Sequence, residues 1–161
     1  MKALFSLCTE FLNYDQCTGI FTWIKSRGMA KKGSTAGCKD SRGYVVISIG
    51  GKRHYAHRLA VLMSTGSVVE SEVIDHINGD KSDNRLFNLR AVSHAVNQQN
   101  QRAPSKNNRS GFLGVKLLRG SYIAQICVDG SPKYLGTFKT REEAGSAYLD
   151  AKRELHEGCT I

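Results

Sequence analysis

Apolar residues recur with a helical period near the start of the chain and follow a strand-like pattern soon after. Between residues 4 and 14 they return every three or four positions, which predicts a helix. The runs 20–24 and 44–49 are rich in β-branched and aromatic side chains, which predicts strands. Residues 50–52, Gly-Gly-Lys, separate the second run from 53–56, so this region predicts a hairpin with glycine at its turn.

The middle of the chain predicts a helix, two strands around a polar loop, and a further helix. Residues 57–64 have helical spacing, and Gly66 ends that pattern. The short apolar runs 73–76 and 86–92 predict a pair of strands. Residues 94–101 then predict a helix, which gives the order strand, loop, strand, helix.

The composition changes after a polar, basic segment at 102–109 that predicts a linker. Beyond it, Thr140 and Glu143 form a capping-box pattern at the start of a predicted helix, 141–156. Three strand-like runs with turn residues between them precede that helix: 112–118, 122–128 and 133–138.

We therefore predict an α+β protein of two domains. Residues 1–101 hold a β-rich N-terminal extension and the strand–loop–strand–helix core, which begins at about residue 55. Residues 102–109 link it to a second domain, 110–161, in which one helix covers a small three-stranded antiparallel sheet. A chain of 161 residues is long enough for one compact domain or two small ones.

Positive charge dominates the composition. The chain has 23 Lys and Arg against 14 Asp and Glu, which gives a formal net charge of +9. Nucleic acid is the partner that fits this excess best, because neutralising phosphates releases counterions. A basic protein without such a partner would have the same composition, so charge alone does not decide between them.

The five cysteines are scattered and form no Cys-x-x-Cys pair, so we expect reduced thiols and no structural zinc. Thr9-Glu10 interrupts the apolar start too soon for a signal peptide, and no segment has the length of a membrane span. We therefore expect a cytoplasmic protein without a membrane partner.

The candidate chemistry begins at the dipeptide Asp75-His76, at the end of the predicted strand 73–76. A carboxylate is a hard oxygen ligand for a divalent metal, and an imidazole is a general base near neutral pH. Asn88 follows His76 by twelve residues, and Asn97 follows Asn88 by nine. The segment Asp83-Asn84-Arg85 lies between the first two of these positions.

This pattern resembles the HNH nucleases of the phage and intron type, whose first motif reads Asp-His and whose last ligand is Asn. The resemblance implies a ββα-metal unit and a phosphodiester hydrolase. It assigns His76 as the general base and Asn88 as the residue that fixes the loop and orients that histidine. It assigns Asp75 and Asn97 as ligands of one Mg²⁺, for which Mn²⁺ would substitute.

Other residues near this pattern compete for roles. His94 lies three positions before Asn97 on the same predicted helix face and is a rival metal ligand. His57-Arg58 recurs just before the loop in members of the family. Arg58 would then contact phosphate, and His57 would be a metal ligand or a neighbour of the ligands. The alternative for both is an ordinary helix start with an exposed basic residue.

The second domain resembles the AP2-type DNA-binding domain through Ser110–Val115, Tyr122–Ile126, Tyr134–Phe138 and Glu142–Tyr148. The resemblance implies that the sheet faces DNA. The arginines with which such domains read guanine are absent from that face here, so contact with the DNA backbone is the expectation. Across the whole chain, the residues expected to contact DNA are Lys25, Arg27, Lys31, Lys32, Arg58, Arg85, Arg90, Lys116, Arg119 and Lys133.

The resemblances together imply a homing or mobile-element endonuclease acting on double-stranded DNA in a bacterium or a phage-infected host. The alternative from another class is a non-catalytic DNA-binding regulator that keeps an HNH scaffold. The intact set of Asp75, His76, Asn88 and Asn97 argues against that alternative. The sequence leaves open whether the chain acts as a monomer or as a homodimer.

Overall fold

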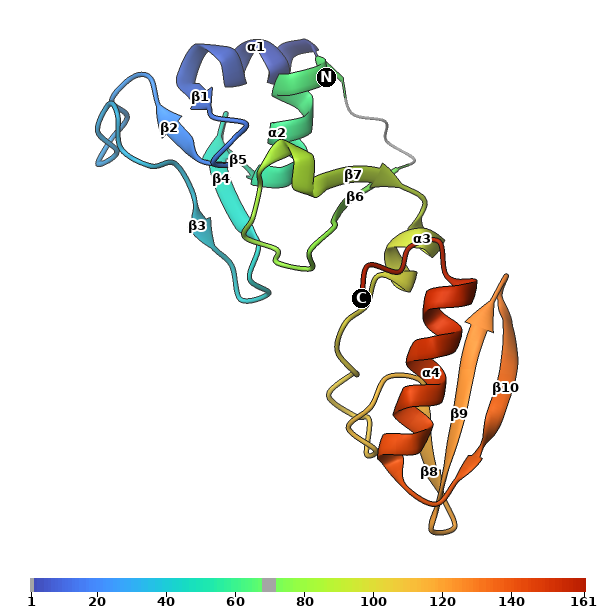
Figure 1. Ribbon diagram of the computed structural model, residues 1–161. Helices are drawn as coiled ribbons and strands as arrows, with labels where there is room; N and C mark the ends of the chain where they lie inside the picture. Colours follow the sequence, from blue (N-terminus) through green and yellow to red (C-terminus); the bar gives the residue numbers. More distant parts are fainter. Residues whose placement is uncertain (1, 68–71) are drawn as a thin grey trace. The chain divides into compact units, whose positions relative to one another are not determined.

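A computed structural model describes residues 2–67 and 72–161 of the chain (Figure 1). It divides into two compact units, one ending at Ser93 and the other beginning at His94. Both units mix helices with small antiparallel sheets, in agreement with the predicted fold class. Within the described residues, no helix has the length and apolar character needed to cross a membrane.

Within its described residues, the first unit contains two α-helices and three small antiparallel sheets, β1–β2, β3–β4–β5 and β6–β7. Its elements are α1 (Lys2–Phe11), β1 (Leu12–Tyr14), β2 (Phe21–Trp23), β3 (Cys38–Lys39), β4 (Val45–Ile49), β5 (Lys52–Tyr55), α2 (Ala56–Thr65), β6 (Val73–His76), a 3₁₀ turn (Leu86–Asn88) and β7 (Leu89–Val92).

One apolar core holds the first unit together and is built from both helices and the first two sheets. Its buried members are Cys8, Leu12, Phe21, Trp23, Ala36, Ile47, Ile49, Ala56, Leu59, Ala60 and Leu62. Burial of such side chains stabilises a domain by roughly 1.5–3 kcal/mol for each large one. The loop that follows β6 lies outside this core and depends on polar contacts.

Several local predictions for the first unit are confirmed. β4 and β5 form the predicted hairpin, and Gly50 and Gly51 at its turn have φ of 59° and 74°, values that favour glycine. The helix α2 ends at Gly66, which adopts a left-handed conformation and donates its N–H to the Leu62 carbonyl.

Two boundaries predicted for the first unit are wrong. The first helix ends at Phe11, because Leu12–Tyr14 pair with β2 and Leu12 enters the core opposite Trp23. The second strand of the loop region begins at Leu89, because the preceding residues form a 3₁₀ turn that brings Asn88 back to the loop.

The second unit consists of α3 (His94–Gln99), β8 (Val115–Leu118), β9 (Ser121–Val128), β10 (Ser131–Phe138) and α4 (Arg141–Leu155). The strands form the predicted antiparallel sheet in the order β10–β9–β8, and α4 packs along one face of it (Figure 1). Val115, Ala124 and Ala144 form the centre of the core between helix and sheet. The likeness to AP2 domains remains a prediction.

The segment predicted as a linker packs within the second unit. Asn108 donates through Nδ2 to the Phe112 carbonyl at 2.8 Å, and Arg102 donates to the Thr160 carbonyl at 3.1 Å. The buried ammonium of Lys152 donates to the Gln101 carbonyl. The boundary between the compact units therefore falls before α3, whereas the sequence placed that helix in the first domain.

The predicted capping box at the start of α4 is confirmed and predicts a stability effect. Thr140 Oγ1 accepts the Glu143 N–H at 3.2 Å, and the Glu143 carboxylate accepts the Thr140 N–H. Thr140→Ala should lower the free energy of unfolding by about 1 kcal/mol in chemical denaturation of the full chain. Ser146→Ala, which removes an exposed hydroxyl from the same helix, is the control. An equal loss in both variants would contradict the role of the cap.

Candidate active site

His76 is the last residue of β6 and lies where the strand enters the polar loop. Only 4% of the residue is exposed. Burial lowers the pKa of its imidazole below the usual 6.5, because a charged ring is poorly solvated there, while the nearby Asn84 and Asp75 partly oppose this shift. The ring is therefore neutral at physiological pH and able to accept a proton.

Asn88 closes the loop that follows His76. Its Oδ1 accepts the Asn78 N–H at 2.9 Å, and its Nδ2 donates to the Asp83 carbonyl at 2.8 Å. Its own carbonyl accepts the Ile77 N–H at 2.9 Å. Because Asn88 is 97% buried, these bonds stabilise the loop without competition from water. Asn88 therefore joins the two sides of the loop that follows His76.

An ion pair stiffens the far side of the loop. Arg85 donates through Nε and Nη2 to the two carboxylate oxygens of Asp83, at 2.8 and 2.5 Å. This guanidinium holds the pKa of Asp83 at about 2, well below its usual range. Arg85 also packs over the Phe87 ring at 4.6 Å. Arg85 was expected to contact DNA, but in the structure much of its hydrogen-bonding capacity serves the loop.

Asp75 and Arg90 face each other across the two-stranded sheet. The guanidinium donates through Nε and Nη2 to Asp75 Oδ2, at 3.0 and 2.9 Å. A buried carboxylate requires such a counter-charge, because removing it from water costs several kcal/mol. Arg90, predicted to contact DNA, therefore has a place beside the expected metal ligand.

His76 and three neighbouring rings form an aromatic cluster. The His57 and His76 rings meet edge to face with centroids 5.0 Å apart, and Tyr44 lies 5.3 Å from His57 and 5.9 Å from His76. Tyr55 stacks on His57 at 5.4 Å. His57 is thus a neighbour of the proposed base. Arg58 follows it on α2 and is half-buried.

His57 is buried as a neutral ring. Within the described residues, its Nδ1 has no hydrogen-bond partner. Burial lowers its pKa to about 3, and the neighbouring His76 and Arg58 add to the shift. The uncharged imidazole therefore packs against Tyr44 and Tyr55 as an aromatic ring.

Asn84 is a site residue that the sequence did not identify. It is 97% buried, and its Oδ1 lies 3.5 Å from His76 Nε2. The Asp83-Asn84-Arg85 signature pointed to the loop, but contact with His76 depends on how the loop folds. Tyr44 was likewise expected only as the first residue of a strand.

The basic loop before β3 is only partly available for DNA. Lys25 forms an ion pair with Glu10 at 2.8 Å, and Arg27 donates to the Ser48 carbonyl at 3.2 Å. Lys31 and Lys32 are exposed. Lys31 and Lys32 fit the expected DNA contact better than Lys25 and Arg27 do, because the latter two already have partners within the protein.

The other predicted site residues belong to the second unit. On α3, His94 is exposed and Asn97 is half-buried. Lys116, Arg119 and Lys133 are exposed on or beside the sheet. These residues belong to the second compact unit, whereas Asp75 and His76 belong to the first.

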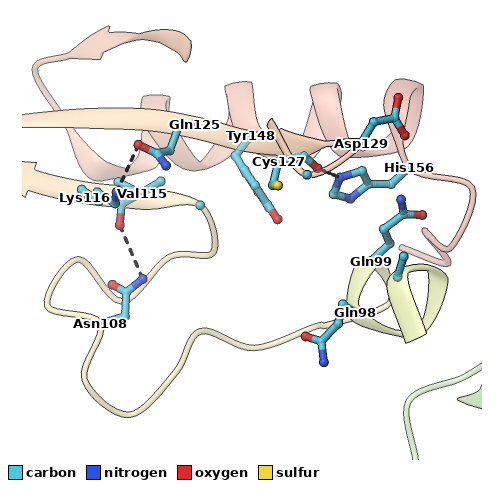
Figure 2. A pocket seen from close by; sticks show the side chains of 13 residues that line it. Gln98, Gln99, Asn108, Val115, Lys116, Gln125, Cys127, Asp129, Tyr148 and His156 are labelled. Carbon is cyan, nitrogen blue, oxygen red and sulfur yellow. Dashed lines mark hydrogen bonds between the residues drawn. The ribbon is translucent and has the colours of Figure 1, made fainter. Parts of the chain in front are cut away.

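A cavity of about 540 Å³ opens in the second unit, between α3, the ends of β8 and β9, and α4 (Figure 2). Its lining includes Lys116, which donates to Gln125 Oε1 at 3.2 Å. His156 also lines it and bonds through Nε2 with the Cys127 carbonyl at 2.8 Å. The side-chain amides and the ammonium of Lys116 make part of the cavity wall polar.

A metal site would need donors beyond acids, histidines and cysteines. Within the described part of the chain, no three side chains of these types gather closely enough to hold an ion. Asp75 supplies one carboxylate, so the remaining donors would be amides, waters or a substrate phosphate. Such oxygen donors are those that Mg²⁺ prefers.

A comparison with known protein families matches the part of the chain that contains this loop. A family model described as HNH endonuclease matches residues 54–99, a range that contains Asp75, His76, Asn88 and Asn97. The chain is 31% identical over 119 residues to the DNA endonuclease I-HmuI of Bacillus phage SP01, which covers 69% of this chain and 68% of that protein. A solved structure of DNA binding and cleavage by the HNH homing endonuclease I-HmuI is 26% identical, covers 92% of this chain and 88% of that one, and has a TM-score of 0.47.

Because burial lowers the pKa of His57 to about 3, we predict that the folded protein loses stability in acid. The unfolded chain binds a proton at this residue below pH 6.5, whereas the folded protein does so only near pH 3. The stabilising contribution is therefore complete above pH 6.5 and is lost as the pH falls toward 3, by at most about 1.4 kcal/mol per pH unit.

His57→Phe tests this effect, because it keeps a ring in the cluster and removes the titration. The difference in unfolding free energy between wild type and variant should be constant above pH 7 and change between pH 6.5 and 4. His76 titrates in both proteins, so the difference contains the titration of His57 and its coupling to His76. A difference independent of pH would contradict the assignment.

Proposed function

Because the chain belongs to the HNH endonuclease family, we propose that it is a metal-dependent DNA endonuclease of the homing type that hydrolyses phosphodiester bonds. The observation that carries this proposal is the buried, neutral His76 next to the buried carboxylate of Asp75 at the end of β6. The relative from Bacillus phage SP01 is named as a DNA endonuclease, which supports DNA as the substrate.

His76 is the proposed general base, which takes the proton from the attacking water. Its burial keeps it uncharged, as a base must be before the reaction. Asn88 contributes by holding the loop on which the entrance to the site depends. Tyr44 and His57 restrict the ring from the other side.

HNH nucleases generally use a divalent metal, and we propose Mg²⁺, with Mn²⁺ able to replace it. Asp75 is the proposed carboxylate ligand, and Arg90 orients it through bonds to Oδ2. Asn97 is the proposed second ligand on the strength of its place in the sequence pattern. When bound, the cation would supply positive charge to the leaving oxygen of the DNA phosphate.

The proposed DNA contacts are the exposed cations of both units. In the first unit these are Lys31 and Lys32, and the half-buried Arg58, which follows His57 on α2, is a further proposed contact. In the AP2-like second unit they are Lys116, Arg119 and Lys133. Side chains of this kind neutralise phosphates without reading bases, so binding should weaken as salt rises.

The rival proposal is a DNA-binding protein that keeps the scaffold without catalysis. A scaffold role would require the loop bonds of Asn88 but no buried neutral histidine beside a buried carboxylate. Buried polar groups of this kind cost stability, so their presence favours cleavage.

The first test addresses the base. His76→Ala should lower the rate of cleavage of supercoiled plasmid by roughly 10²-fold or more, the usual cost of losing a general base. Affinity for DNA, measured by gel shift in EDTA, should stay near the wild-type value because the cations are unchanged. Wild-type cleavage by this variant would contradict the assignment.

A second test addresses the metal ligands. Asp75→Ala and Asn97→Ala should each abolish cleavage that depends on Mg²⁺ or Mn²⁺, whereas His94→Ala should keep most of it. Plasmid nicking is measured with each metal and with EDTA. If His94→Ala removes the activity and Asn97→Ala does not, His94 is the ligand.

A further inference from the structure

The side-chain amide of Asn84 has one possible orientation. Its Nδ2 donates to the Ser82 carbonyl at 3.1 Å, and a carbonyl can only accept a hydrogen bond. Turning the amide over would place two oxygens against each other. Oδ1 must therefore be the atom that faces His76 Nε2, at 3.5 Å.

This orientation selects one form of the neutral imidazole. An amide oxygen is only an acceptor, so the nitrogen facing it must carry the hydrogen. In a neutral histidine the other nitrogen then holds the lone pair. A hydrogen on Nε2 thus places the basic lone pair of the ring on Nδ1.

We propose that Asn84 is a positioning residue that fixes the tautomer of His76, and that the N-terminal segment 14–21 holds Asn84 in place. The proposal rests on His76 as the general base and adds the residues on which its basic atom depends. Residues 14–21 lie outside the range 54–99 matched by the HNH family model.

Two hydrogen bonds and one close approach join the N-terminal segment to the loop. Tyr14 donates its hydroxyl to the Asn84 carbonyl at 2.7 Å, and the Leu86 N–H donates to the Gln16 carbonyl at 3.0 Å. A Cβ at Gly19 would lie 2.5 Å from Arg85 N and 2.6 Å from the Asn84 carbonyl carbon. The backbone of the loop thus packs directly on the turn between β1 and β2.

Tyr14 is a rigid anchor for this contact. Its ring stacks on Phe21, with centroids 4.6 Å apart, and Phe21 belongs to the apolar core. Burial and the nearby Asp15 and Asp83 raise the pKa of its hydroxyl to about 12, so the hydroxyl remains a donor. The core of the first unit is therefore connected to Asn84 through one side chain.

Kinetics separate positioning from a purely structural role. Asn84→Ala should lower kcat by roughly 10- to 100-fold, the range seen when a partner that orients an active group is lost, with KM and DNA affinity unchanged. Asn84→Asp keeps an oxygen toward His76 but sets its second oxygen against the Ser82 carbonyl, so it should restore only part of the rate. Tyr14→Phe keeps the stacked ring and should lower kcat less than Asn84→Ala does. Thr9→Ala, which removes a hydroxyl bonded to the Phe5 and Ser6 carbonyls on α1, is the control and should leave kcat unchanged.

Nitrogen NMR of the histidine rings tests the proposal without any reaction. At pH 8 the ¹⁵N shifts of His76 in the full chain should show hydrogen on Nε2. Asn84→Ala should mix the two tautomers, and Asn84→Asp should keep the wild-type form. Circular dichroism and thermal melting confirm that each variant is folded.

The outcomes distinguish the two proposals. Hydrogen on Nδ1 in the wild type, or an unchanged tautomer and kcat in Asn84→Ala, would overturn the role of Asn84. A wild type that never cleaves DNA would refute the proposed function, whereas the tautomer measurement would still decide whether Asn84 orients the ring.

Discussion

Hydrogen bonds hold the loop between β6 and β7, and everything in the candidate site depends on them. His76, Asn84 and Asn88 are all buried, although each side chain is polar. Each buried polar group left without a partner costs about 1–3 kcal/mol, so few loop conformations satisfy all of them at once. Asn88 further restricts the conformations that the loop can adopt, because its side chain bonds to both halves of the loop.

The sheet β6–β7 provides the counter-charge that the buried carboxylate of Asp75 requires. The register that places Asp75 opposite Arg90 brings the counter-charge without any contribution from the loop. Loop and sheet therefore have separate tasks: one holds the imidazole, and the other holds the carboxylate. Adjacent residues on a strand point to opposite sides, so the two groups are held independently.

Much of the architecture follows from local signals in the sequence. The Gly-Gly hairpin, the end of α2 at Gly66 and the cap of α4 are each encoded within a few residues, and all three are observed. The strand at Leu12–Tyr14 was not foreseen, because its pairing with β2 depends on a turn whose geometry the periodicity does not reveal. Similarly, α3 continues the pattern of the loop region in sequence but packs within the second unit.

The candidate site was predictable as a set of residues but not as a set of contacts. Spacing identified Asp75, His76 and Asn88, all three of which are buried around one loop. Charge counting assigned Arg85 and Arg90 to DNA, because a sequence does not show which cations face a carboxylate across a sheet or a turn. Asn84 escaped notice because its importance arises only when the loop folds back onto His76.

The contact of the β1–β2 turn with the loop bears on how such a nuclease can be transplanted. A designer who grafts the family-matched range 54–99 onto another scaffold would leave Tyr14, Gln16 and Gly19 behind. The graft would need a substitute surface that accepts the Asn84 and Arg85 backbone at the same close approach, which a glycine provides here. The segment that must be transferred is therefore longer than the range matched by the family model and begins at β1.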